Sequence, residues 1–314
     1  MLGSDSLAET RAFNESLMEI FESAPPLESV PPEVTRALRK EGEGILPPPV
    51  LSPRASWLEI PSRGGGLRLR MLPPEREAAG AFLHIHGGGW VLGAADEQDF
   101  LLEAIADATG LCAVSVDYRL APEHSYPAGH DDCEDAALWL LEQGAAELGV
   151  PARFAIGGES AGASLSVATL LRLRDRHGIE GAFAAANLVY GAFDLTGTPS
   201  RRIWGDRQLV LSDTIMNWFT QCLVGAVDDS ARRDPDLSPL YADLRNMPPA
   251  LFTVGTADAL IDDSLFMAAR WQAAGNRAEL RVYEEACHAF TAFPIAVAHE
   301  ANAAQLAFLR DALA

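Results

Sequence analysis

Most of the chain from residue 81 onward alternates between short, almost wholly apolar segments and longer segments with helical periodicity. The apolar segments, which predict strands, are residues 81–86, 111–118, 153–158, 184–190, 250–255 and 280–284. The periodic segments, which predict helices, are residues 97–108, 131–147, 161–176, 262–274 and 294–313. Apolar strands that alternate with helices indicate an α/β protein, with a mostly parallel sheet covered on both faces.

Three other stretches do not follow this alternation. Residues 56–60 and 67–72 are short strand-like segments around a glycine-rich turn, which predicts an antiparallel hairpin and brings the sheet to eight strands. Residues 7–23 and 33–40 have helical spacing, but too few apolar positions for a core of their own. About sixty residues between the fourth and fifth apolar segments are partly helical and rich in aromatic residues. Insertions at that place in a sheet build lids and substrate pockets.

The segment AIGGESAGASL places a G-x-S-x-G sequence, residues 158–162, directly after a strand and at the start of a helix. Small residues on both sides of Ser160 permit the sharp turn that exposes a serine hydroxyl, and the helix N-terminus beneath it favours developing negative charge. Three specified positions would arise by chance in roughly one of ten chains of this size. The strand, turn and helix context is what makes Ser160 a candidate nucleophile.

A nucleophilic serine needs a base, and the base needs an orienting carboxylate; after such a turn the acid comes first in the chain and the histidine second. Three histidines follow Ser160. His177 lies at a helix end and His299 inside the last helix, whereas His288 follows the last strand at the reactive end of the sheet. Asp258 follows the preceding strand at the same end. A turn or a helix cap would also explain Asp258, but its place beside the other two favours catalysis.

Three consecutive glycines, Gly87, Gly88 and Gly89, follow the strand at 81–86. Glycine loses more conformational freedom on folding than any other residue, so this run indicates an unusual backbone path or the close approach of a ligand. Acyl transfer generates an oxyanion, and each backbone N–H directed at it contributes about 2.7 to 4 kcal/mol of transition-state stabilisation. The glycine run and the amide of Ala161 are the expected donors.

The composition limits the kinds of partner that this protein is expected to bind. Forty-four acidic residues against 24 basic ones give a formal net charge of −20, which disfavours nucleic acid and anionic membrane surfaces. The N-terminal residues lack a basic region ahead of an apolar one, and no apolar run reaches membrane-spanning length, so we expect a cytoplasmic protein. The four cysteines are widely spaced, which argues against a metal or redox site, and Cys287 beside His288 is interpreted as a buried thiol.

Six motifs carry a resemblance to a known family: HGGGW, DYRLAPEHSYPA, GESAG, SPLYADLRNMPPALF, VGTADALIDD and CHAF. Together, and in this order, they resemble the hormone-sensitive-lipase-like carboxylesterases, also called bacterial family IV, from about residue 56 to the C-terminus. The resemblance implies an α/β-hydrolase fold with a helical cap, and hydrolysis of short- to medium-chain acyl esters without a cofactor or a metal. Family members frequently form dimers, so a homodimer is compatible with the sequence.

The resemblance also assigns residues to roles. The implied nucleophile is Ser160, the general base and acid is His288, and the residue that orients the base is Asp258. The implied oxyanion hole consists of Gly88, Gly89 and Ala161. Residues implied to support the glycine loop and the nucleophile turn are His86, Gly87, Tyr118, Glu123 and Glu159.

The family's architecture divides the chain into four intervals. Residues 1–54 would form an N-terminal cap arm, 55–194 the first part of the core, 195–247 a cap insertion and 248–314 the second part of the core. Apolar side chains that line the substrate pocket are expected among Trp90, Trp204, Leu209, Trp218 and Phe219, with Phe13, Met18 and Phe21 from the arm. Ordinary packing is the competing explanation for all of these residues.

Four positions depart from the family's pattern. Glu159 stands where aspartate or threonine is usual, Ala259 replaces a proline after the acid, Ser164 replaces a frequent asparagine, and Ala289 replaces the glycine of HGF. We expect Ala289 to have an ordinary backbone conformation. Because no departure removes a catalytic group, they bear on subfamily and substrate rather than on the chemistry.

The sequence therefore predicts a two-step acyl transfer in which His288 takes the proton of Ser160 and water later releases the acid. Activity should rise with pH as the imidazole loses its proton. Two alternatives stay open: an amidase or peptidase with the same triad, and a ligand-binding protein on a hydrolase scaffold. No charge pattern specifies a peptide terminus, and the presence of His288 argues against the binding protein.

Overall fold

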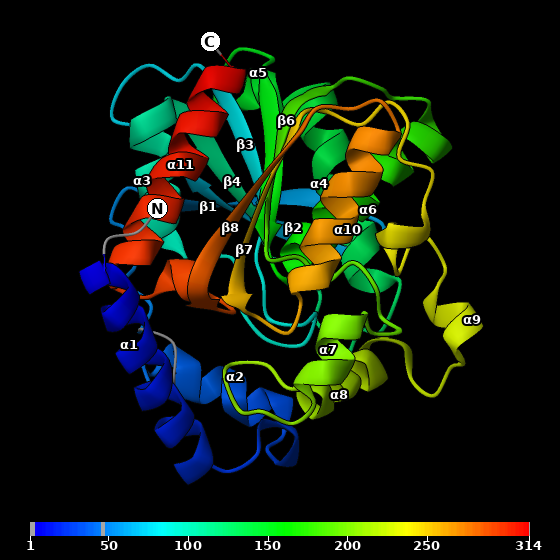
Figure 1. Ribbon diagram of the computed structural model, residues 1–314. Helices are drawn as coiled ribbons and strands as arrows, with labels where there is room; N and C mark the ends of the chain where they lie inside the picture. Colours follow the sequence, from blue (N-terminus) through cyan, green and yellow to red (C-terminus); the bar gives the residue numbers. More distant parts are fainter. Residues whose placement is uncertain (1–3, 45–47, 314) are drawn as a thin grey trace.

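The computed structural model describes residues 4–44 and 48–313, and an eight-stranded sheet forms its centre (Figure 1). β2 pairs antiparallel with β1 and β4, and the remaining neighbours pair in parallel. The predicted hairpin and mostly parallel sheet are thus confirmed. The strand order is β1 (Ser56–Ser62), β2 (Gly65–Leu72), β4 (Leu111–Val116), β3 (Gly80–Ile85), β5 (Phe154–Glu159), β6 (Phe183–Val189), β7 (Ala250–Ala257) and β8 (Ala278–Cys287).

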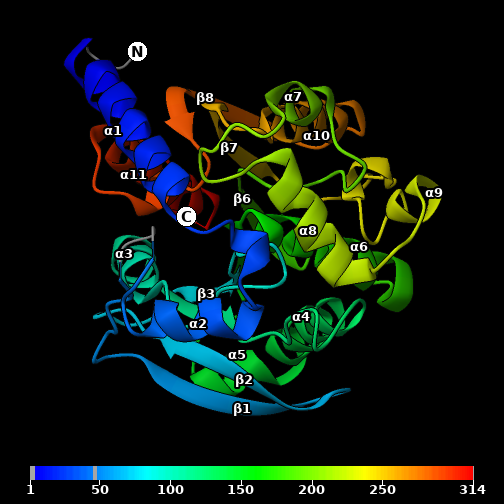
Figure 2. The same ribbon diagram turned by 90° about the horizontal axis from the view of Figure 1, so that it is seen from below.

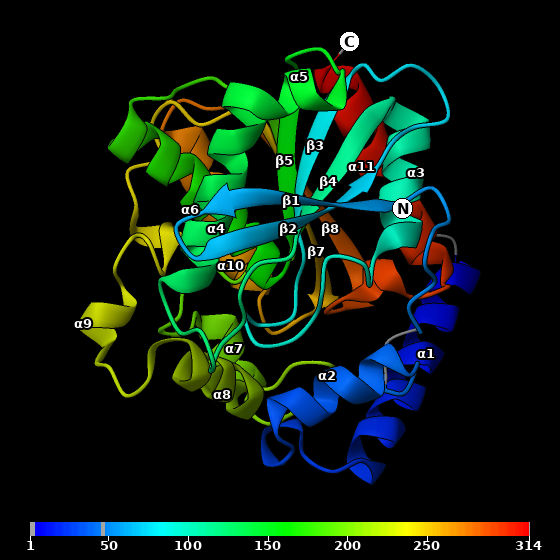
Figure 3. The ribbon, with the colours of Figure 1, turned by 180° about the vertical axis from the view of Figure 1, so that it is seen from behind.

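Burial along the strands follows from their place in the sheet. β3, β4 and β5 are buried along their whole length, because helices cover both faces there. β1 lies at an edge and is largely exposed; it accommodates Pro61, which a central strand would exclude. Figure 3 shows β1 and β2 crossing the parallel strands at a steep angle, as sheet twist requires. The loops after β3, β5, β7 and β8 emerge together at one end of the sheet.

Helices pack on both faces of the sheet. α3 and α11 contact each other on one face, and α4 and α6 contact each other on the opposite face, beside α10 (Figure 1). Their bounds are α3 (Asp99–Thr109), α4 (Ala128–Trp139), α6 (Ala161–His177), α10 (Ile261–Ala273) and α11 (Ala296–Ala312).

The helix predicted over 131–147 is irregular. A π-helical turn, Leu140–Gly144, joins α4 to the short helix α5 (Ala145–Leu148). Gly144 suits this turn, because a Cβ there would lie 2.9 Å from the ring of Trp139. Hydrophobic periodicity alone does not distinguish a π-helical turn from a regular helix.

A second group of helices lies beyond the carboxyl ends of the strands (Figures 1 and 2). It comes from two separate stretches of the chain, and we call α1, α2, α7 and α8 the outer helices. A 3-10 turn between α1 and α2 contacts α8, which joins the two stretches. The bounds are α1 (Ser4–Ser23), the 3-10 turn (Leu27–Ser29), α2 (Pro32–Lys40), α7 (Pro199–Trp204), α8 (Asp213–Val224), α9 (Asp229–Arg232) and a later 3-10 turn (Pro239–Tyr241).

Specific contacts anchor the N-terminal outer helices to the core. The ring of Phe13 in α1 packs on the ring of Phe293, with 4.8 Å between centroids. Arg36 of α2 donates hydrogen bonds to the carbonyl oxygens of Val91 and Ala121, both at 2.7 Å. As the sequence predicted, this arm is ordered by packing on other elements rather than around its own core.

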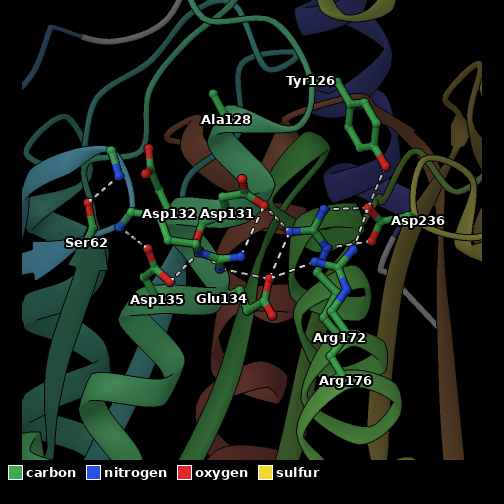
Figure 4. Close-up of polar contacts among 12 residues, drawn as sticks. Ser62, Tyr126, Ala128, Asp131, Asp132, Glu134, Asp135, Arg172, Arg176 and Asp236 are labelled. Atoms are coloured by element: carbon green, nitrogen blue, oxygen red, sulfur yellow. Dashed lines mark hydrogen bonds and ion pairs between the residues drawn. The ribbon is translucent and has the colours of Figure 1, made fainter.

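A group of charged side chains around the buried Arg172 links α4 and α6 to the end of the insertion (Figure 4). Arg172 of α6 donates to Asp131 at 2.8 Å and to Glu134 at 3.1 Å. It also donates to Asp236, beyond α9, at 2.6 Å. Arg176, one turn later, contacts Glu134 at 3.1 Å, but its side chain is 44% exposed, against 3% for Arg172.

Candidate active site

Ser160 occupies a strained turn between β5 and α6. Its backbone angles are φ 55° and ψ −119°, which a residue other than glycine adopts only when its surroundings enforce it. The glycines two positions before and after it explain how the turn fits: a Cβ on Gly158 or on Gly162 would overlap the carbonyl oxygen of Ile85 in β3. The G-x-S-x-G spacing therefore lets β3 pack closely against the turn, and Ser160 remains partly exposed at the end of the sheet.

Three residues far apart in the chain form one hydrogen-bonded line at this end. His288 Nε2 lies 2.9 Å from Ser160 Oγ, and His288 Nδ1 lies 2.8 Å from Asp258 Oδ2. The other carboxylate oxygen of Asp258 accepts a hydrogen bond from the N–H of Leu260 at 2.8 Å. Asp258 is 1% exposed and His288 4%. With the imidazole proton on Nδ1, Nε2 is free to accept the serine proton, which is the arrangement that nucleophilic catalysis requires.

The glycine loop lies against this line of residues. Gly88 and Gly89 have φ values of 113° and 62°, so both depend on glycine's freedom. A Cβ on Gly87 would lie 2.9 Å from the carbonyl oxygen of Glu159, and a Cβ on Gly89 would overlap the ring of Phe219 in α8. The loop is therefore enclosed between the turn at Ser160 and an outer helix, with no space for side chains.

The predicted support residues hold this loop in different ways. The ring of His86 stacks on that of Tyr118 at 4.2 Å, and the Tyr118 hydroxyl donates to the carbonyl oxygen of His86 at 3.0 Å. Burial lowers the pKa of His86 to about 4, so its ring is neutral at pH 7 and its Nδ1–H donates to Gly87 O at 2.8 Å. Glu123 acts indirectly: it pairs at 2.9 Å with Arg36, whose guanidinium holds the end of the loop.

Glu159 points back into the sheet rather than toward Ser160. Its Oε2 lies 3.0 Å from Nε2 of His84 in β3, and Nδ1 of the same ring lies 2.8 Å from Ser115 Oγ in β4. All three side chains are buried. They join three neighbouring strands, β4, β3 and β5, near their carboxyl ends. We did not identify His84 and Ser115 from the sequence, although polar residues inside the apolar segments LHIH and VSVD were a usable signal.

The residues predicted to line the pocket lie on two sides of the site. Phe219 contacts Gly89, and the centroid of the Trp218 ring lies 5.0 Å from that of the Phe219 ring. Leu209 packs instead in a cluster with Tyr190, beside Trp204 and the arm residue Phe13.

Several of these apolar side chains also have clear packing roles. The indole N–H of Trp204 donates to the carbonyl oxygens of Arg207 and Leu211. Trp90 is buried with φ 62° and belongs to the main core. Met18 and Phe21 pack against the cluster that contains Leu209.

The expectation for Ala289 is wrong. This residue has φ 61° and ψ 13°, a left-handed conformation, rather than an ordinary one. The 3-10 turn that follows (Phe290–Ala292) is closed by a hydrogen bond from Ala292 N–H to Ala289 O at 3.0 Å, and Phe290 is fully buried. Tertiary packing therefore enforces a backbone shape that alanine disfavours. A left-handed conformation costs a residue with a Cβ about 1 to 2 kcal/mol.

The four cysteines are free thiols, and Cys287 is buried, as interpreted from the sequence. Burial raises the pKa of Cys287 to about 12, which keeps that thiol neutral and unreactive beside His288. Among the residues that the structure describes, no group of His, Cys, Asp and Glu side chains is arranged to hold a metal ion. None of the helices in this same part of the chain is long and apolar enough to cross a membrane.

Comparisons with known proteins agree with the geometry. The family described as alpha/beta hydrolase fold matches residues 82–292. Carboxylesterase NlhH of Mycobacterium tuberculosis is 34% identical over 294 residues, 90% of this chain and 89% of that protein. The hyperthermophilic esterase from Pyrobaculum calidifontis superposes with a TM-score of 0.86 at 30% identity, over 96% of this chain and 98% of that one. A hormone-sensitive lipase from a metagenome library reaches 0.83 at 26% identity, over 97% and 98%.

This chain therefore belongs to the α/β-hydrolase fold family. Within that family it is a carboxylic ester hydrolase of the hormone-sensitive-lipase-like group, which confirms the resemblance stated from its motifs.

Proposed function

We propose that this enzyme is a serine carboxylesterase that hydrolyses short- to medium-chain acyl esters through an acyl-enzyme intermediate. The line from Ser160 through His288 to Asp258, with contacts of 2.9 and 2.8 Å, is the observation that carries the proposal. In this role Ser160 is the nucleophile and His288 is the general base and then the general acid. Asp258 orients the imidazole and stabilises its protonated form.

The reaction proceeds in two steps. In the first, His288 Nε2 takes the proton of Ser160 as Oγ attacks the ester carbonyl carbon, and the same proton passes to the departing alcohol. In the second, a water molecule gives its proton to Nε2 and attacks the acyl-enzyme, which releases the acid and restores the serine. The buried carboxylate of Asp258 keeps the base in one orientation throughout both steps.

The oxyanion formed in each step would be held by the N–H groups of Gly88, Gly89 and Ala161. Two features support this assignment. The glycine loop packs on the carbonyl of Glu159, adjacent to the nucleophile, and Ala161 begins α6, where backbone N–H groups have no partner within the helix. Removing one such donor typically lowers kcat by about 10² to 10³-fold.

The outer helices would act as a cap over the site. In this division residues 1–54 and 195–247 form the cap, and 55–194 with 248–314 form the core; residues 1–3, 45–47 and 314 lie outside the described part of the chain. The contact between Phe219 and Gly89 brings α8 onto the glycine loop, which limits the space on that side. We expect this enclosure to favour short and medium acyl chains over long ones.

The first experiment measures initial rates on p-nitrophenyl esters from acetate to dodecanoate. We expect turnover to peak at short or medium chains in the wild type and to vanish in folded Ser160→Ala. The control is Ser166→Ala in the same helix. The buried Ser166 hydroxyl donates to the carbonyl oxygen of Gly162 at 2.8 Å, so its removal should leave turnover intact.

Equal rates in wild type and Ser160→Ala would refute the assignment of the nucleophile. Turnover of p-nitroanilides but not of esters would instead indicate an amidase. Ligand binding without turnover of either substrate would indicate a binding protein.

A further inference from the structure

Tyr190 follows the last residue of β6, and backbone hydrogen bonds hold it next to the turn at Ser160. Its N–H donates to the carbonyl oxygen of Thr253 in β7 at 2.6 Å. The carbonyl of Val189, just before it, accepts the N–H of Ser160 at 2.8 Å. Tyr190 has φ 36° and is 3% exposed. A bulky residue takes such a φ only where the surroundings determine its position, and such sites are often functional.

The side chain of Tyr190 reaches the loop that carries His288. The centroid of its ring lies 4.8 Å from that of the imidazole, at an interplanar angle of 57°. Its hydroxyl lies 2.6 Å from Thr291 Oγ1, three residues beyond His288. Thus one side chain contacts the base directly and also holds the turn that follows it.

A second partner restrains the same turn from the other side. Asn302 of α11 donates to the carbonyl oxygen of Thr291 at 3.0 Å. Between His288 and Thr291 lies Ala289, whose left-handed conformation is unfavourable without such restraints. The contact of Tyr190 with Thr291 therefore opposes relaxation of the segment that sets the orientation of the imidazole.

The electrostatic surroundings give the ring a second effect. The titratable groups near this pair are Asp258 after β7, Glu159 at the end of β5, and Cys287 at the end of β8. Burial raises the pKa of Tyr190 well above its usual value, so its ring stays neutral beside the imidazole. The face of a neutral aromatic ring within about 6 Å stabilises a cation, and more strongly where water is excluded. His288 becomes a cation during each proton transfer of the proposed mechanism.

We propose that Tyr190 is a positioning residue for the esterase reaction, which orients His288 through Thr291 and stabilises the protonated imidazole with its ring. The inference rests on the proposed function, because it requires His288 to be the base. Tyr190 belongs to none of the motifs recognised in the sequence.

The test separates the hydroxyl from the ring. Tyr190→Phe keeps the ring, Thr291→Val removes the partner of the hydroxyl, and Tyr190→Leu removes the ring. The matched control is Tyr283→Phe, a buried tyrosine whose ring lies 5.5 Å from Phe290 in the same turn. For each folded variant, kcat and KM for p-nitrophenyl butyrate and the pH profile of kcat/KM are measured.

Tyr190→Phe and Thr291→Val should each lower kcat by about 3 to 10-fold with KM unchanged, the range that one neutral hydrogen bond spans. The double variant should be no slower than the slower single variant, because both remove the same contact. Tyr190→Leu should also move the acidic limb of the profile to lower pH by about 0.4 to 1.5 units, since the imidazolium loses its aromatic neighbour.

Wild-type kcat in both hydroxyl variants, an additive double variant, or an equal effect of Tyr283→Phe would overturn the positioning role. An unmoved acidic limb in Tyr190→Leu would overturn the role of the ring, and if that variant does not fold, the hydroxyl variants decide the positioning role. Failure of the proposed function looks different: the wild type would lack an acidic limb, or Ser160→Ala would retain turnover.

Discussion

Replacement of Arg172 or Arg176 by methionine tests how much burial decides the value of an ion pair in this protein. Both arginines lie in α6, one turn apart, and both contact Glu134 at 3.1 Å. Each replacement removes one positive charge and keeps an unbranched chain of similar length. The side chain of Arg172 is 3% exposed and that of Arg176 is 44% exposed. Burial also gives Arg172 closer ion pairs, because it donates to Asp131 and Asp236 as well, whereas Arg176 lies 3.5 Å from Asp236.

We expect Arg172→Met to lower the free energy of unfolding by about 3 kcal/mol. Removing one partner of a buried ion pair costs about 3 to 5 kcal/mol, because the remaining charges stay buried and unpaired. The lower end applies here, because Glu134 keeps hydrogen bonds from His177 at 2.7 Å and from Arg63 at 2.9 Å. Arg176→Met should cost about 0 to 1 kcal/mol, as exposed pairs do.

The assay is equilibrium unfolding in urea, monitored by tryptophan fluorescence and by circular dichroism to check that both probes give one transition. The initial rate of ester hydrolysis at low urea shows whether the folded enzyme is intact. Equal destabilisation by the two replacements would refute the reasoning, because it would mean that charge rather than burial sets the cost. A loss below 1 kcal/mol for Arg172→Met would refute it as well.

Three further outcomes are expected. Ala289→Gly should raise the free energy of unfolding by up to about 1 kcal/mol, because relief of the left-handed conformation exceeds the entropy gained by the unfolded chain; a destabilised variant in urea would contradict this. Gly89→Ala should lower kcat/KM for p-nitrophenyl butyrate by about 10²-fold, because its Cβ displaces Phe219 and the loop, whereas Gly178→Ala, also at positive φ but in open space, should leave kcat/KM unchanged. The free energy of unfolding should fall in acid, because Glu134 becomes protonated. Burial raises the pKa of Glu134, but hydrogen bonds from His177 and Arg63 outweigh it, so the folded-state pKa lies below its usual value. The stabilisation that ionised Glu134 provides is therefore complete above about pH 5, and it disappears as the pH falls through the lower pKa of the folded state. Urea midpoints measured between pH 7 and pH 3 that do not decline would contradict this prediction.

Local sequence was sufficient wherever the residue types that a constraint demands lie together in one short segment. The turn around Ser160 is such a case, because both glycines of G-x-S-x-G are needed to clear a single carbonyl of β3. The place of His288 and Asp258 was predictable for a related reason. Both follow parallel strands, and the carboxyl ends of parallel strands meet at one end of a sheet.

Other features depend on partners that no segment of the sequence identifies. Glu123 reaches the glycine loop only through Arg36, which lies 87 residues earlier in the chain. The contact between Tyr190 and Thr291 spans 101 residues, and neither residue belongs to a recognised motif. Ala289 was assigned an ordinary backbone from its residue type, but the packing of Phe290 and the turn that follows overrode that preference.

Hydrophobic pattern and short motifs were enough to predict the fold class, the succession of strands and helices along the chain, and the candidate catalytic residues at the end of the sheet. These depend on periodicity and on residue types within short windows, where steric and hydrophobic constraints act locally. The sequence did not indicate which outer helix packs on the glycine loop, which side chains contact His288, or that Ala289 takes a left-handed conformation. Those outcomes arise from contacts between residues tens to hundreds of positions apart, and the free energy of packing them together exceeds any local preference.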